Sequence, residues 1–180
     1  NNTVFEKHAV AIEGNRIKEV GPEVVLKAAY ASFEQLDGQG RLLMPGFTNA
    51  HMHFYGMYAR GLALSATPTN FHEILQHLWW ALDKVLDLDA VFYSALVPAI
   101  TSIKKGVTSV IDHHASPNAV DGSLDRIEDA LSEVGMRGIL CYEVSDRDGK
   151  VIRDQGLAEN ERYIRKCQQG KAANPDHAFE

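Results

Sequence analysis

Large apolar residues alternate with alanines near the start of the chain, where Val10 and Ile12 follow Ala9 and Ala11. Val10 and Ile12 precede the polar turn EGNR, and Ile17 and Val20 follow it. A period of two is typical of strands with one buried face, and a short turn with a glycine joins antiparallel strands. The pattern therefore predicts a β-hairpin, which a short helix over residues 22–31 follows.

From residue 70 onward the apolar positions follow the period of an α-helix. Apolar residues recur three and four positions apart over residues 71–88 and again over residues 89–105. Asn70 and Glu73 form a capping box at the start of the first helix. Pro98 lies inside the second helix, where we expect it to produce a kink or to disturb one turn.

The rest of the chain alternates short apolar runs with amphipathic helices. The strand-like runs are VTSVIDHH and MRGILCYEV, and helical periods occupy residues 122–135 and 156–169. The last segment, ANPDHAFE, reads as the start of a further strand. Such alternation is typical of parallel sheets with helical crossovers, so we predict an α/β fold. This fold is either a compact open sheet or the front part of a barrel, which needs eight strands and about 250 residues.

Two histidines separated by one residue stand at the end of another apolar run. The segment RLLMPGF, expected to be a strand, leads to His51 and His53. Side chains at i and i+2 of a strand point to the same face, so the two imidazoles can bind one divalent cation at about 2.0–2.1 Å. Binding sites of parallel α/β folds form at the carboxyl ends of strands. An H-x-H triplet alone is common and often marks only a loop, but its apolar and aromatic flanks favour a metal site.

The segment DHHASP is a second candidate cluster. Asp112, His113 and His114 stand at the end of a predicted strand, where such side chains can bind substrate or metal. Alternation puts His113 and His114 on opposite faces, so at most one should face a pocket. We favour His114 for that place. The alternative is that one histidine points into the core and the other forms a hydrogen bond with a loop backbone.

Composition narrows the class of protein. The 180 residues are 45% hydrophobic and 23% charged, as in a soluble globular protein. The net charge of -6, with dispersed basic residues, argues against a nucleic-acid partner. The two cysteines, Cys141 and Cys167, fit a reducing compartment. We find neither an apolar run of about 18 residues nor a leader, so we expect a cytoplasmic protein with no membrane partner.

A longer segment around the histidine pair resembles a known family. LLMPGFTNAHMHFYGMYARGL is similar to the opening of the amidohydrolase superfamily, in which an hPGhhNxHxH motif lies on the first barrel strand. The segments LWWALDKVLD and GVTSVIDHHASP resemble its branch of cytosine deaminases and chlorohydrolases, in particular the SsnA-like aminohydrolases. The resemblance covers nearly the whole chain and is strongest over residues 42–149.

The resemblance implies the front part of a metal-dependent hydrolase (β/α)8 TIM-like barrel, preceded by strands of a small β-sandwich domain. Residues 1–43 then belong to the sandwich and residues 44–180 to the first half of the barrel. His51 and His53 match the metal ligands of the first barrel strand, for one divalent ion, Zn²⁺ or Fe²⁺. The candidates for contacts with the substrate are His114, Tyr55 and Arg60.

Part of the family's ligand set has no counterpart among these residues. The family also uses a histidine of the fifth strand, an aspartate of the eighth and a glutamate that shuttles a proton. Two ligands are too few for a catalytic zinc site, which has three from the protein. We therefore expect the chain to be an incomplete portion of a longer polypeptide.

The resemblance implies a deaminase or other aminohydrolase, in which a metal-activated water hydrolyses a C–N bond of a purine- or pyrimidine-like small molecule. Two alternatives stay open. One is another amidohydrolase, which cleaves a cyclic amide or a C–Cl bond, and the other is a catalytically inactive barrel that serves as an assembly subunit. We expect a small-molecule substrate and a homo-oligomer, most simply a dimer. These residues do not identify the substrate.

Overall fold

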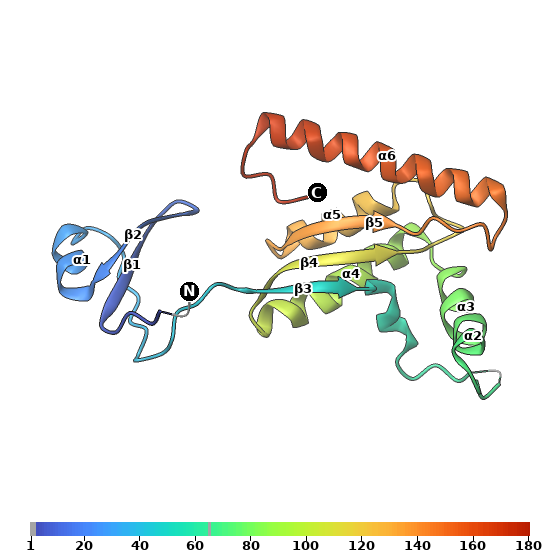
Figure 1. Cartoon of the computed structure of the whole chain (residues 1–180), viewed down its shortest axis with the longest axis horizontal. Coiled ribbons are helices and arrows are strands. Elements are labelled where there is room, and N and C mark those ends of the chain that lie inside the picture. The colour runs from blue at the N-terminus through green and yellow to red at the C-terminus, as the bar shows by residue number, and fades with distance from the viewer. Residues whose placement is uncertain (1–2, 65) are drawn as a thin grey trace. The chain divides into compact units, whose positions relative to one another are not determined.

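A computed structural model describes residues 3–64 and 66–180 of the chain. It divides into two compact units, Asn1–Met44 and Pro45–Glu180. We describe each unit by itself (Figure 1).

The first unit is built on the predicted hairpin. Strands β1 (His8–Glu13) and β2 (Arg16–Pro22) pair antiparallel and form a two-stranded sheet. Helix α1 (Glu23–Ala29) follows at once, with Leu26 buried. The predicted hairpin and the predicted helix are therefore confirmed.

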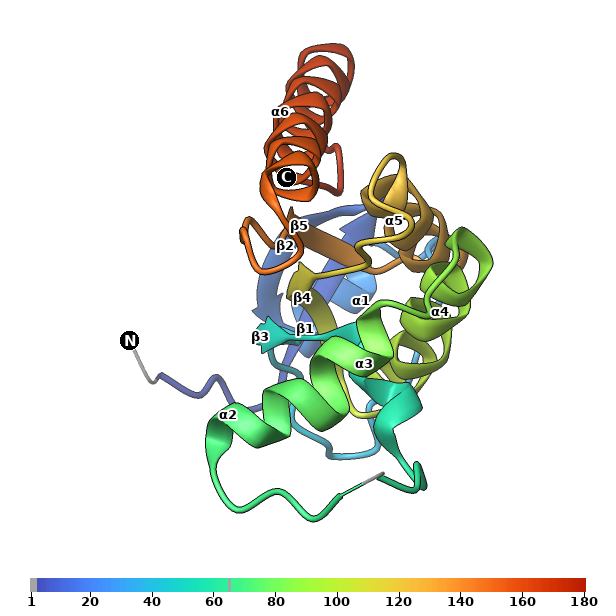
Figure 2. The ribbon, with the colours of Figure 1, turned by 90° about the vertical axis from the view of Figure 1, so that its right-hand side faces the viewer.

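The second unit contains a three-stranded parallel sheet. Its strands are β3 (Phe47–Met52), β4 (Val107–His114) and β5 (Arg137–Tyr142), in the order β3-β4-β5. Helices α4 (Leu88–Lys104) and α5 (Ser123–Glu133) pack against each other and against the sheet, as Figures 1 and 2 show. The predicted alternation of strands and helices is confirmed.

The chain ends beside the edge strand of this sheet. After helix α6 (Lys150–Ala173), Phe179 forms a parallel bridge with Gly138 of β5. The backbone N–H of Leu140 donates to the carbonyl of Glu180 at 2.9 Å. The last residues therefore pair with β5 in the parallel sense, at the place where the sequence predicted the start of a strand.

Two predicted elements have different bounds in the structure. The apolar run RLLMPGF was expected to form a strand, but the strand begins only at Phe47, because pairing with β4 begins there. The helix predicted over residues 71–88 ends at Asp83. It consists of α2 (Phe71–Ile74), a π-helical turn, η2 (Leu75–Trp79), and α3 (Trp80–Asp83).

The structure confirms one predicted helix start and departs from two other details of the predicted helices. The side chain of Asn70 accepts a hydrogen bond from the backbone N–H of Glu73, so the predicted cap is confirmed. Helix α4 continues through Pro98 without interruption, so the disturbed turn expected at this proline is not found. Helix α6 begins at Lys150, earlier than the apolar period indicated.

No single helix in the described ranges is long and apolar enough to cross a membrane. The segments Phe71–Asp83 and Leu88–Lys104 reach the required length and composition only as a pair, which bends by 111° at the break between them.

The core of the second unit lies between the sheet and helices α4 and α5. The buried apolar side chains there include Val91, Val110, Leu124, Ile127 and Leu131. On β4, burial alternates: Val110, Asp112 and His114 are buried, whereas Ile111 and His113 are only partly buried. One face of β4 therefore packs into the core, and the opposite face carries Ile111 and His113.

Candidate active site

The two histidines of the H-x-H triplet lie side by side where β3 ends. His51 is on the strand, and His53 is the first residue after Met52, directly before the 3-10 helix η1 (Phe54–Ala59). Their Nε2 atoms are 3.1 Å apart, and their rings are nearly perpendicular. Two nitrogens bound to one tetrahedral ion at about 2.05 Å lie roughly 3.3 Å apart. The donor atoms therefore converge as binding of one small cation requires.

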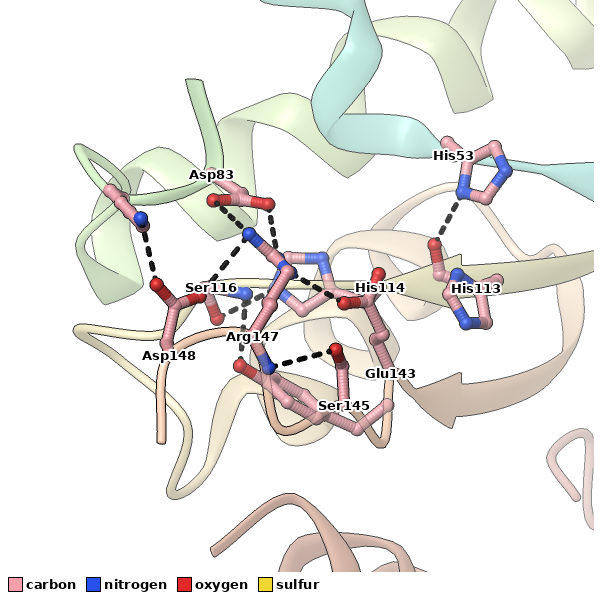
Figure 3. A network of polar contacts seen from close by, with 11 residues as sticks. His53, Asp83, His113, His114, Ser116, Glu143, Ser145, Arg147 and Asp148 are labelled. Atoms are coloured by element: carbon pink, nitrogen blue, oxygen red, sulfur yellow. Dashed lines mark hydrogen bonds and ion pairs between the residues drawn. The ribbon is translucent and has the colours of Figure 1, made fainter. Parts of the chain in front are cut away.

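The orientation of His53 is fixed by a backbone carbonyl. Its Nδ1 lies 2.8 Å from the carbonyl oxygen of His113, as the dashed line in Figure 3 shows. A carbonyl only accepts, so the proton of His53 is on Nδ1 and its Nε2 is free to bind a metal. This is the arrangement that ligating histidines commonly have. The donor set of the pair thus fits a divalent metal ion such as Zn²⁺.

In the segment DHHASP, the histidine that faces the pair is not the one that the sequence favoured. His113, not His114, lies beside the pair, with its ring centroid 5.2 Å from that of His53. His114 points to the opposite face of β4 and is 0% exposed. The reason is register: Asp112 and His114 share the face that packs into the core. Contact of His114 with a substrate stays a prediction.

Burial favours the neutral form of both imidazoles of this cluster, because it lowers the pKa of each. Burial, and then the charge of His53, lowers the pKa of His113. Burial lowers the pKa of His114 to about 3. The Nε2 of His114 is 2.9 Å from the hydroxyl of Ser116, which itself donates to the carbonyl of Ala119. The Nε2–H of His114 therefore donates to the hydroxyl of Ser116, and this buried hydrogen bond indicates a structural role for His114.

Two aromatic rings flank His53. Tyr55 is buried in η1, and its ring is 5.6 Å from Trp79 in an edge-to-face arrangement. Trp79 itself lies 5.7 Å from the ring of His53. Burial, and then the carboxylate of Asp83, raises the pKa of Tyr55, so its phenol stays protonated. The two rings form an aromatic wall beside the histidine pair.

Arg60, the third side chain expected to contact a substrate, is exposed and directly follows η1. Contact of Arg60 with a substrate stays a prediction. The aromatic wall itself depends on Gly56, because a Cβ atom at that position would lie 2.9 Å from Cη2 of Trp79.

An ion network that the sequence did not reveal lies close to this wall. Figure 3 shows Arg147, in the loop after β5, between Asp83, Glu143 and Asp148. Its closest nitrogen–oxygen distances are 2.6 Å to Asp83, 2.8 Å to Glu143 and 3.2 Å to Asp148. Burial raises the pKa of Asp83 even though Arg147 opposes the shift. Glu143, Arg147 and Asp148 are close in sequence, but no local spacing signals that Asp83 of α3, 64 positions before Arg147, joins them.

Within residues 3–64 and 66–180, no three histidine, cysteine or acidic side chains are arranged to bind a metal ion together. The described part of the chain therefore offers two metal ligands, His51 and His53. A catalytic zinc ion takes three ligands from the protein, so the pair fits part of such a set.

The parallel sheet with its helices and the histidine pair at its carboxyl edge define the class of the protein. Residues 42–175 match the Amidohydrolase family. The chain belongs to this family.

Curated relatives of the chain are deaminases. The chain is 29% identical over 159 residues to a 5'-deoxyadenosine deaminase of Methanocaldococcus jannaschii, covering 88% of this chain and 35% of that protein. It is 32% identical over 150 residues to 5-methylthioadenosine/S-adenosylhomocysteine deaminase 2 of Archaeoglobus fulgidus, covering 81% of this chain and 31% of that protein. The chain thus spans about a third of the length of these relatives.

Solved structures share the fold at lower identity. A triazine hydrolase from Arthrobacter aurescens has a TM-score of 0.72 at 19% identity, covering 98% of this chain and 41% of its own. The guanine deaminase of E. coli has a TM-score of 0.66 at 14% identity, covering 94% and 38%. A mutant of atrazine chlorohydrolase TrzN from the same Arthrobacter species, complexed with zinc and atraton, has a TM-score of 0.60 at 23% identity, covering 74% and 30%.

Proposed function

We propose that the protein containing this chain is a metal-dependent deaminase that hydrolyses a C–N bond of a purine- or pyrimidine-like small molecule. The observation that carries the proposal is the approach of the His51 and His53 Nε2 atoms to 3.1 Å at the end of β3. Family membership and the deaminases among the relatives support the reaction type. The proposal concerns the whole protein, because this chain spans only about a third of the length of the relatives.

We infer that β3, β4 and β5 are the first three strands of a (β/α)8 barrel. Their parallel order, and the parallel bridge that Phe179 forms with β5, support this arrangement. The hairpin β1–β2 would then belong to a β-sandwich domain, of which it supplies two strands. In this arrangement, the carboxyl ends of the strands form the mouth of the active site.

His51 and His53 would bind one divalent ion, and Zn²⁺ is favoured because a structural neighbour is complexed with zinc. When bound, such an ion lowers the pKa of a coordinated water toward about 7 and so supplies a nucleophile. The carbonyl of His113 keeps the Nδ1 proton on His53, which leaves its Nε2 available as a ligand.

The other residues of the site would bind the heterocycle. Trp79 is partly exposed and offers an apolar ring that suits a flat aromatic substrate, and the buried ring of Tyr55 packs against it from behind. His113 faces the pair and burial favours its neutral form, so its ring can form a hydrogen bond with a ring nitrogen of the substrate. Arg60, which is exposed directly after η1, and His114, which is buried on β4, are the remaining candidates for contacts with the substrate.

The test is metal analysis and ammonia release with the full-length protein. We expect about one Zn²⁺ per chain and release of ammonia from at least one substrate in a panel of aminopurine nucleosides, guanine, cytosine and adenine. The panel should include 5'-deoxyadenosine, on which a relative acts by its name. Metal-replete protein that releases no ammonia from the whole panel would contradict the proposal.

A second candidate function is hydrolysis of a C–Cl bond, because one structural neighbour is named as an atrazine chlorohydrolase. Chlorinated triazines in the same panel, assayed for chloride, distinguish this reaction from deamination. The third hypothesis is a catalytically inactive barrel. Release of ammonia or chloride by metal-loaded protein would exclude it. The homodimer, the cytoplasmic location and the closer likeness to SsnA-like aminohydrolases stay predictions.

A further inference from the structure

Asp112 is a completely buried carboxylic acid that contacts the segment carrying His53. It lies on β4, is 0% exposed, and its Oδ1 accepts a hydrogen bond of 2.9 Å from the backbone N–H of Phe54. Phe54 directly follows His53 and begins η1. The bond joins positions 58 residues apart in the sequence. It holds the point at which the chain leaves β3.

The next residue of β4 holds the ring of the same histidine. The carbonyl of His113 accepts from Nδ1 of His53 at 2.8 Å. Two consecutive residues of β4 thus hold this part of the chain: Asp112 bonds to the backbone N–H of Phe54, and His113 bonds to the imidazole of His53. The last residue of β3 that pairs with β4 is Met52, opposite Asp112, so the sheet ladder does not reach His53 and Phe54.

The second oxygen of Asp112 has no contact that would give the carboxyl another structural role. Oδ2 is buried and has no hydrogen-bond partner in the described part of the chain. Burying such a group costs free energy, and an apolar side chain of similar size would fill the place without that cost. The hydrogen bond to Phe54 is therefore the interaction that this carboxyl supplies.

We propose that Asp112 is a positioning residue for the candidate metal centre. By accepting the N–H of Phe54, it sets the direction in which His53 presents Nε2 toward His51. Ligands must lie within about 0.5 Å of their productive places, and loss of such a supporting contact typically weakens metal binding 10–100-fold. The inference rests on the proposed metal site.

The test compares two substitutions in the full-length protein. Asp112→Val is close to the native side chain in size and suits a strand, but it removes the acceptor. Asp112→Asn keeps an acceptor oxygen at the same place. Titration of Zn²⁺ against a competing chelator should show an affinity about 10–100-fold weaker for Asp112→Val and nearly native for Asp112→Asn.

A control separates positioning from general destabilisation. Leu131 of α5 is also 0% exposed and lies near Gly138 at the start of β5, whereas the histidine pair lies at the end of β3. Leu131→Ala should lower stability by about 2–5 kcal/mol without changing the affinity for Zn²⁺. If Asp112→Val does not fold, Asp112→Ala replaces it, because the smaller side chain causes no clash.

The outcomes distinguish failure of this inference from failure of the proposed function. Native protein that binds no Zn²⁺ contradicts the metal site itself. If the native protein binds Zn²⁺ and Asp112→Val or Asp112→Ala binds it equally tightly, the positioning role of Asp112 is wrong but the metal site stands.

Discussion

The guanidinium of Arg147 lies 2.6 Å from a carboxylate oxygen of Asp83, a residue 64 positions earlier in the chain. The same guanidinium lies 5.4 Å from the ring centroid of Trp80. Asp83 and Trp80 belong to α3, so Arg147 attaches the loop after β5 to the helical segment that brings Trp79 to His53. The position of the aromatic wall thus depends on an ion pair between two segments that are distant in sequence.

Removal of Arg147 should destabilise the fold markedly. Asp83 is 1% exposed, so Arg147→Met leaves a buried carboxylate without its partner. We expect a loss of about 3–5 kcal/mol in the free energy of unfolding, measured by urea denaturation. Arg153→Met is the control, because its partner Asp154 is well exposed and such pairs contribute about 0–1 kcal/mol. Equal effects of the two substitutions would show that burial of the pair does not matter.

The histidine pair should account for metal binding. His51→Ala and His53→Ala each remove one donor, so we expect substoichiometric Zn²⁺ in either purified variant, measured by elemental analysis, and loss of turnover. His72→Ala is the matched control, since His72 is exposed on α2 and contacts the ring of Trp80. Chelation should inactivate the native protein, and added Zn²⁺ should restore it. Full metal content in both variants would refute the assignment of these ligands.

A methyl group at Gly56 should displace the aromatic wall. The new Cβ would lie 2.9 Å from Cη2 of Trp79, a distance at which one of the two must move. We expect Gly56→Ala to raise KM for the heterocyclic substrate several-fold, to change tryptophan fluorescence, and to leave the Zn²⁺ content native. Gly38→Ala is the control, because a Cβ there meets nothing within 4 Å. An unchanged KM would remove Trp79 from the substrate pocket.

His114 should make stability depend on acidity. Burial lowers its pKa in the folded protein to about 3, from 6.5 for a free histidine. The unfolded chain therefore binds a proton that the folded protein does not, and stability is lost as pH falls from about 6.5 toward 3. One such proton corresponds to about 1.4 kcal/mol per pH unit.

The measurement is urea denaturation of the native protein and of His114→Gln between pH 4 and 7.5. The slope of the free energy of unfolding against pH should be shallower in the variant over the acid part of this range. Identical slopes would mean that His114 takes up no additional proton on unfolding.

The sequence by itself determined most of the helices and strands and the pairing of His51 with His53. Helical periods, the hairpin and the strand VTSVIDHH depend on local spacing, and the structure has them close to their predicted places. The i, i+2 relation likewise predicted that His51 and His53 share a face. The two rings still meet although His53 lies just beyond the strand, because the carbonyl of His113 holds Nδ1 of His53.

Only the tertiary structure decided what surrounds that pair. Local spacing could show that His113 and His114 face opposite ways, but the register of β4 and the packing of α4 and α5 decided which one faces His53. The strand expected at RLLMPGF was wrong in position because a strand needs a neighbour, and pairing with β4 starts at Phe47. The bonds of Asp112 to Phe54 and of Arg147 to Asp83 join residues about 60 positions apart, and no periodicity in one sequence encodes such a contact.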